Sequence, residues 1–100
     1  MDTSPMEFEC IRFQDRVFKF RPPLRLNIAR DDETGSLYVA SDDELGLHAY
    51  AETREQLAHE IAEQVAFNWD EYAQEAPDKL ARGALRLREA MRARVEEIHA

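Results

Sequence analysis

Apolar and polar residues alternate along the first half of the chain, which is the pattern of half-buried β-strands. In "MEFECIRF" the apolar positions are Met6, Phe8 and Cys10, and the phase then shifts to Ile11 and Phe13. A shift of this kind accompanies a β-bulge or the approach to a turn. The pattern therefore predicts a first strand that carries such an irregularity.

The polar segment "QDR" is predicted to turn the chain into a second strand at "VFKF", residues 17–20, which completes a hairpin. Pro22 and Pro23 follow closely. Because proline donates no hydrogen bond to a ladder, these two residues predict a break before the next strand.

A second hairpin is predicted from "LRLNIA" (residues 24–29) and "LYVA" (residues 37–40). Between them "DDETGS", residues 31–36, supplies turn chemistry, since Asp side chains bond the local backbone and glycine tolerates positive φ. "SDDELG", residues 41–46, is a further polar connection, and "LHAYA", residues 47–51, is a short third strand.

The second half of the chain changes to a helical period. Thr53, with Gln56 three residues later, fits a capping box and begins a helix predicted over residues 53–73, before Pro77. A second helix is predicted over residues 79–98. The apolar stripe of the first consists of Leu57, Ile61, Val65, Trp69 and Tyr72, and that of the second of Leu80, Ala84, Leu87, Met91, Val95 and Ile98.

Strands first and helices last indicate an α+β fold of one domain, residues 1–100. Residues 1–5 are expected to form a frayed tail, and residues 6–51 mainly strands. The prediction is an N-terminal antiparallel sheet, made of hairpins plus a third core strand, packed against two C-terminal amphipathic helices.

Charge is distributed unevenly along this fold. The net charge is −8. Residues 1–30 hold six Lys/Arg against four Asp/Glu, residues 31–77 one against thirteen, and residues 78–100 six against four. The middle of the chain is thus a concentrated anion of −12, which repels nucleic acid and speeds encounter with a basic protein partner. A solvated face that only keeps the protein in solution is the alternative.

Location follows from what the chain lacks. No window approaches the eighteen or more apolar residues of a membrane span. The beginning, "MDTSPMEFEC", has no basic region followed by an apolar core, so it is not the pattern of a signal peptide. Cys10 is the only cysteine, which rules out an internal disulfide. A reducing, cytoplasmic setting is expected.

No catalytic or metal signature is found, so we expect neither an enzyme nor a cofactor. The two acidic runs lack the ligand alternation of an EF-hand and are better explained as solvated turns. His48, His59 and His99 are scattered, and His48 shares a strand face with Tyr50. Cys10 has no nucleophile pattern around it and is expected to be a small buried apolar group.

The segment from Leu24 to Ala66 resembles the HicB-like antitoxins. It contains a hairpin whose second strand ends in "YVA", the connection "DDELGLHAYAET", and a helix beginning at "TREQL". Leu45 and Gly46 match the family's small-residue kink, and Thr53 its helix start. The family's proline before that glycine is absent, and no C-terminal DNA-binding segment is recognised.

The resemblance implies a protein that binds, and holds inactive, a small basic RNase toxin. Such a partner suits the acidic middle of the chain. The candidate partner-binding residues are Asp42, Asp43, Glu44 and Phe67; Phe67 lies off the helical stripe, and packing beneath the last helix is its alternative. A homodimer, formed through a sheet edge, is also expected.

A second hypothesis is a phage or mobile-element inhibitor, anti-CRISPR-like, whose acidic surface imitates nucleic acid. The last predicted helix raises the opposite question, because it carries Arg82, Arg86, Arg88, Arg92 and Arg94. Glutamates interrupt this stripe and no aromatic residues interleave with it. We therefore expect these arginines to pair with the acidic middle, and expect no direct binding of nucleic acid.

Overall fold

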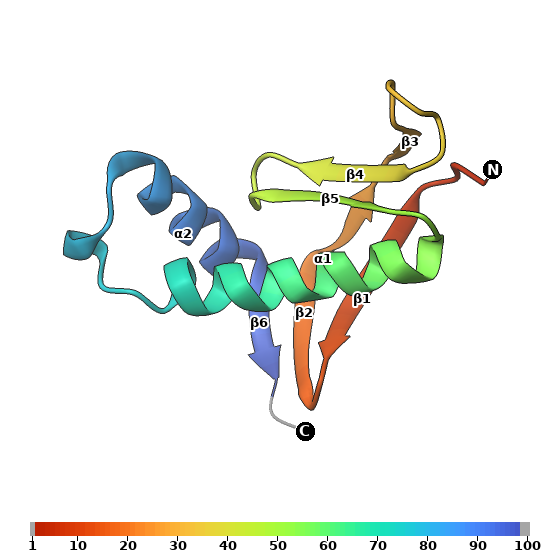
Figure 1. Cartoon of the computed structure of the whole chain (residues 1–100). Coiled ribbons are helices and arrows are strands. Elements are labelled where there is room, and N and C mark those ends of the chain that lie inside the picture. Colours follow the sequence, from red (N-terminus) through yellow and green to blue (C-terminus); the bar gives the residue numbers. More distant parts are fainter. Residues whose placement is uncertain (1, 99–100) are drawn as a thin grey trace.

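The computed structural model describes residues 2–98 and is an α+β fold of two three-stranded antiparallel sheets and two helices (Figure 1). The elements are β1 (Met6–Phe13), β2 (Arg16–Leu26), β3 (Ile28–Arg30), β4 (Tyr38–Asp42), β5 (Leu47–Ala51), α1 (Arg54–Asn68), a π-helical turn η1 (Trp69–Ala73), a 3₁₀ turn η2 (Pro77–Lys79), α2 (Arg82–Arg94) and β6 (Val95–Ile98). The predicted fold class is confirmed.

The first sheet has the order β1-β2-β6 and contains the predicted first hairpin. The predicted irregularity is present but begins before Cys10 and not after it, since Phe8 pairs with Leu24 but Cys10 pairs with Lys19. The prediction of a break at Pro22 and Pro23 was wrong, because β2 continues through both. The prolines lie where the pairing with β1 is interrupted, so neither has to donate a ladder hydrogen bond.

The second sheet has the order β3-β4-β5, and its last strand confirms the predicted third strand. The segment predicted as one strand, residues 24–29, is divided at Asn27. Leu24 and Leu26 end β2 in the first sheet, while Ile28 begins β3 in the second. All three of these apolar side chains are buried, so the alternation was correct although the chain changes sheets.

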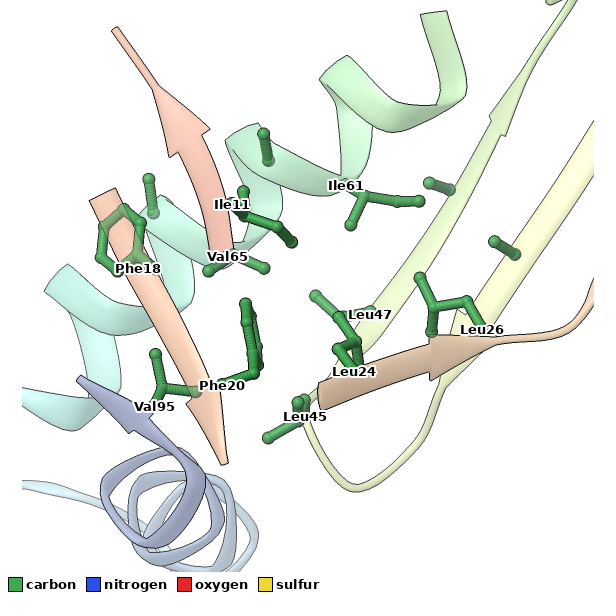
Figure 2. Close-up of a cluster of buried hydrophobic side chains, with 14 of the residues drawn as sticks. Ile11, Phe18, Phe20, Leu24, Leu26, Leu45, Leu47, Ile61, Val65 and Val95 are labelled. Atoms are coloured by element: carbon green, nitrogen blue, oxygen red, sulfur yellow. The ribbon is translucent and has the colours of Figure 1, made fainter. Parts of the chain in front are cut away.

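Helix α1 passes across both sheets and closes one core between them (Figure 1). Thr53 caps it as predicted, because its Oγ1 accepts a hydrogen bond from the Gln56 N–H at 3.1 Å. Leu57, Ile61 and Val65 are almost completely buried. Figure 2 shows Ile61 and Val65 facing side chains from β1, β2, β5 and β6, so α1 holds both sheets together.

The C-terminal segment differs from the prediction. Helix α2 ends at Arg94, and Val95–Ile98 form β6, which pairs with the edge of β2. The predicted helix over residues 79–98 was therefore wrong at both ends, since α2 begins at Arg82, after the turn η2, and residues 95–98 form a strand. Val95 is buried in either arrangement, but as a strand the segment also supplies the backbone partners that β2 lacks on that side.

The beginning of the chain is bonded to Arg54 of α1. Arg54, at the start of α1, donates hydrogen bonds to the carbonyl oxygens of Asp2 and Ser4 at 2.9 and 2.7 Å. The Asp2 carboxylate accepts two more from Ser4. Asp2 and Ser4 are thus bonded to Arg54, although residues 2–5 are exposed; Met1 is outside the described residues.

Candidate functional site: an acid-rimmed aromatic surface

The structure places the predicted partner-binding acids at the turn between β4 and β5. The Asp42 carboxylate accepts a hydrogen bond from the Leu45 N–H at 3.1 Å and so serves the turn itself. Glu44 pairs with Arg94 of α2 at 3.4 Å. Asp43 is exposed and shares a shallow hollow with Arg86 of α2. The negative charge of this turn is therefore partly offset by basic side chains of α2.

Phe67 is one of the most exposed large apolar side chains, with 57% of its surface accessible. It lies on the outer side of α1, so it does not pack beneath the last helix. Its neighbours one turn away are Glu63 and Glu71, both exposed. Phe67 is thus accessible to a partner, but it does not line the hollow that Asp43 shares with α2.

A different surface combines exposed apolar area with dense negative charge. Tyr50, on the outer face of β5, is 56% exposed, and Val39 lies opposite it on β4. Tyr50 and Leu37 both line two adjacent hollows of about 650 and 560 Å³, one toward α1 and one toward the β3–β4 turn. We call Leu37, Val39 and Tyr50, with the lining of these two hollows, the Tyr50 surface.

Six carboxylates surround the Tyr50 surface. Those of the hollow toward α1 are Glu52, Glu55 and Glu60, and those of the hollow toward the turn are Asp31, Asp32 and Glu33. Among the described residues Arg30 is the one Lys or Arg that lines the two hollows, and its guanidinium donates two hydrogen bonds to the Gly35 carbonyl oxygen. The surface is thus strongly negative around an apolar centre.

Asp31 shows that the first acidic run is turn chemistry, as expected. Its carboxylate accepts hydrogen bonds from the Leu37 N–H, the Thr34 N–H and the Thr34 hydroxyl at 2.7–2.8 Å. These hydrogen bonds lower the pKa of Asp31 to about 2, and the bonds from the backbone N–H groups of Leu37 and Thr34 contribute most. Within residues 2–98 no group of three or more His, Cys, Asp or Glu is arranged to hold a metal ion.

The histidines belong to separate places. The His48 ring meets Tyr50 edge-on, with centroids 5.1 Å apart, and so forms part of the Tyr50 surface. His59, on α1, lines its other hollow and lies 6.0 Å from the Phe13 ring. His99 is outside the described residues. The structure thus places His48 and His59 on opposite sides of Tyr50.

Cys10 is exposed, which corrects the expectation that it is buried. The irregularity between Phe8 and Cys10 reverses the alternation, so that Ile11 takes the inward position instead. A shift of one residue moves every following side chain to the other face of a sheet.

The arginines of α2 act mainly on backbone carbonyls. Arg92 donates to the Ala73 oxygen at 3.0 Å and Arg88 to the Glu75 oxygen at 2.9 Å, beyond the C-terminal end of α1. Among the five arginines, only Arg94 pairs with a carboxylate of the acidic middle in the described residues. The expected pairing is therefore correct for one arginine, while two others stabilise a helix terminus.

Comparisons of the chain with protein-family models, with curated proteins and with solved structures give no match. In the part of the chain that the structure describes, no helix is long and apolar enough to cross a membrane.

Sequence reasoning missed Tyr50 as the centre of a site. The available signal was the alternation in "LHAYA", which puts Leu47 and Ala49 in the core and His48 and Tyr50 on the other face. What could not be read is that Leu37 and the N-terminal half of α1 lie beside Tyr50. That juxtaposition depends on how α1 packs against β5.

Proposed function

We propose that this protein is a small acidic binding module whose Tyr50 surface holds a basic segment of a partner protein. The observation that carries the proposal is the exposed Tyr50 between two hollows lined by six carboxylates. Aromatic side chains are the commonest anchors of protein interfaces, and a cation placed over a tyrosine ring is attracted to it. Surrounding carboxylates mainly accelerate and orient the encounter.

The Tyr50 surface does not include Asp42, Asp43 and Glu44, the acids that the sequence suggested. At Asp42 and Glu44, as also at Asp31 of the Tyr50 surface, the carboxylates already have partners within the chain. Those at Glu52, Glu55 and Glu60 are exposed, and among residues 2–98 no Lys or Arg lines their hollow. Charges without a basic neighbour attract an incoming cation more strongly.

The HicB-like version of the proposal makes the partner a small basic RNase that the chain keeps inactive. Its support is the order strand–turn–strand–strand–helix from β3 to α1, with Gly46 at positive φ in the connection and Thr53 as the cap. Co-expression tests it directly. The product of the neighbouring gene should slow growth alone and lose that effect with this chain; no rescue would exclude the antitoxin role.

Binding through the Tyr50 surface is tested with paired charge reversals. Glu52→Lys with Glu60→Lys should slow association with the purified basic partner and weaken its salt dependence. The matched control, Asp43→Lys with Glu71→Lys, changes the net charge equally at exposed positions elsewhere and should leave association close to wild type. Equal loss in both pairs would mean that overall charge, and not this surface, governs binding.

Tyr50→Ala gives the apolar half of the test. Truncating an interface anchor costs about 2 kcal/mol, or roughly a 30-fold weaker Kd, mostly through faster dissociation. The matched control is Phe67→Ala, the other large exposed aromatic side chain. If Phe67→Ala weakened binding and Tyr50→Ala did not, the binding site would be the exposed face of α1 around Phe67.

The nucleic-acid-mimic version predicts a different partner. That partner would itself bind nucleic acid, and an oligonucleotide would displace this chain from it. The homodimer stays a prediction, which sedimentation of the purified chain at several concentrations measures.

A further inference from the structure

Strand β5 pairs with β4 on one side and directs alternate backbone groups to the other. The His48 N–H donates to Gln64 Oε1 at 2.8 Å, and the His48 carbonyl oxygen accepts from Gln64 Nε2 at 2.6 Å. Both groups therefore point away from β4 and toward α1. The opposite residue on β4 is Ser41, so this is a non-hydrogen-bonded pair of the antiparallel ladder.

Tyr50 shares the orientation of His48. The register between β4 and β5 is unbroken from one to the other, and the two types of pair alternate along an antiparallel ladder. The pair of Val39 with Tyr50 is thus also non-hydrogen-bonded. The N–H and C=O of Tyr50 point toward the hollow between β5 and α1.

Gln64 acts as a one-residue substitute for a neighbouring strand. Its side-chain amide offers one donor and one acceptor to His48, as a strand residue would. One and two turns earlier on α1 stand Glu60 and Gln56, which are exposed and line the hollow beside Tyr50. At His48 the Gln64 side chain of α1 thus takes the place of a neighbouring strand. At Tyr50, the next residue with the same orientation, a hollow lies beside the backbone.

The chemistry of the hollow defines what fits there. A residue paired opposite Tyr50 would place its side chain on the same face as the Tyr50 and His48 rings. On that face the acidic run of residues 31–33 lines the adjacent hollow. The residues before and after it in the bound segment would place their side chains on the other face of the sheet. Glu52 and Glu60 line the hollow in which the segment would lie, and their charges favour a basic segment.

We propose that the partner contributes an extended basic segment that adds to β5 as a short strand, with an Arg or Lys side chain opposite Tyr50. This inference rests on the proposed function and specifies its mode of binding. Gln64 ends the pairing at His48, and the helix cap at Thr53 ends it on the other side. Strand β5 ends at Ala51, so backbone pairing is confined to Tyr50, and charge and the tyrosine ring supply most of the affinity.

The test uses an acetylated and amidated peptide with the sequence Arg-Val-Arg-Val-Arg. With Arg opposite Tyr50, the amide N–H groups of the arginines face β5 and those of the valines face away. Methylating the arginine amide nitrogens should weaken binding by a factor of about ten, through a lost hydrogen bond and a steric conflict. Methylating the valine nitrogens keeps charge and composition and should leave the Kd unchanged.

Nuclear magnetic resonance adds a local readout. The amide proton of Tyr50 should shift and exchange more slowly with solvent when the unmodified peptide is bound. Equal binding by all three peptides, or no binding by any, would overturn strand addition. The proposed function would survive either result if the basic partner still discriminates between the two pairs of charge reversals.

Discussion

Replacing Arg16 with methionine tests how the C-terminal strand is held to the rest of the fold. The Arg16 guanidinium donates two hydrogen bonds to the Asp70 carboxylate at 2.7 and 2.8 Å and two to Glu97 at 2.9 and 3.1 Å. It also lies over the Phe18 ring, 5.1 Å from its centroid. One side chain on β2 thus joins η1 and β6, while methionine keeps only the apolar stem.

The expected loss lies between that of exposed and buried ion pairs. An exposed pair contributes about 0–1 kcal/mol, and removing one partner of a buried pair costs about 3–5 kcal/mol. The Arg16, Glu97 and Asp70 side chains are 26%, 17% and 46% exposed. Arg16→Met should therefore lower the free energy of unfolding by about 2 kcal/mol, which in a domain of this size lowers Tm by roughly 8–16 °C.

Thermal and denaturant unfolding of wild type and variant measure this difference. A double-mutant cycle with Asp70→Asn and Arg16→Met gives the interaction energy between Arg16 and Asp70. The pKa of Asp70 is lowered, chiefly by its hydrogen bond with Arg16. Its part of the stability is complete above the ordinary pKa of 3.8 and is lost as the pH falls through the folded-state value. A loss under about 0.5 kcal/mol near pH 7 would refute the reasoning, because it is the value of a solvated surface pair.

Three further perturbations test other parts of the argument. Asp31→Asn should reduce stability above pH 4 but not below pH 2, because the pKa of Asp31 is lowered to about 2 in the folded state; unfolding followed against pH shows it. Gly46→Ala should cost about 1–2 kcal/mol, since φ is +64° and the added Cβ would lie 3.2 Å from the Leu87 side chain, whereas Gly83→Ala, with nothing within 4 Å, should be neutral or slightly stabilising in the same unfolding assay. Gln64→Ala should uncover the backbone of His48 and cause concentration-dependent self-association in sedimentation experiments; a variant that stays in the wild-type state at all concentrations would contradict the assigned edge-covering role.

The local devices of the fold were readable because each depends on neighbours in sequence. Thr53 caps α1 through Gln56, three residues away, and Asp31 closes its turn through Thr34 and Leu37. The shift in alternation likewise predicted that β1 is irregular, although the irregularity lies before Cys10 and not after it. Each of these interactions spans six residues or fewer, or follows from side-chain alternation alone.

The errors share a different cause. Val95–Ile98 fit the apolar period of a helix, but β2 offers an unpaired edge there, and Arg16 and Glu97 join across 81 positions of sequence. Pro22 and Pro23 were expected to end a strand, yet the gap in pairing with β1 accommodates them. In each case a distant segment decided the outcome against a local preference, as tertiary context commonly does.

The fold class, the turns, the helix cap and the negative charge of the middle of the chain all follow from residue type and spacing, so they could be predicted. Which acids meet at one surface depends instead on how the chain packs. Folding offset Glu44 with Arg94 and used Asp42 in a turn, while it brought the carboxylates of residues 31–33 and of α1 to opposite sides of Tyr50. The physical reason is that charge adds along the chain without regard to folding, whereas a binding surface depends on distances between side chains that only the packing of α1 against β5 sets.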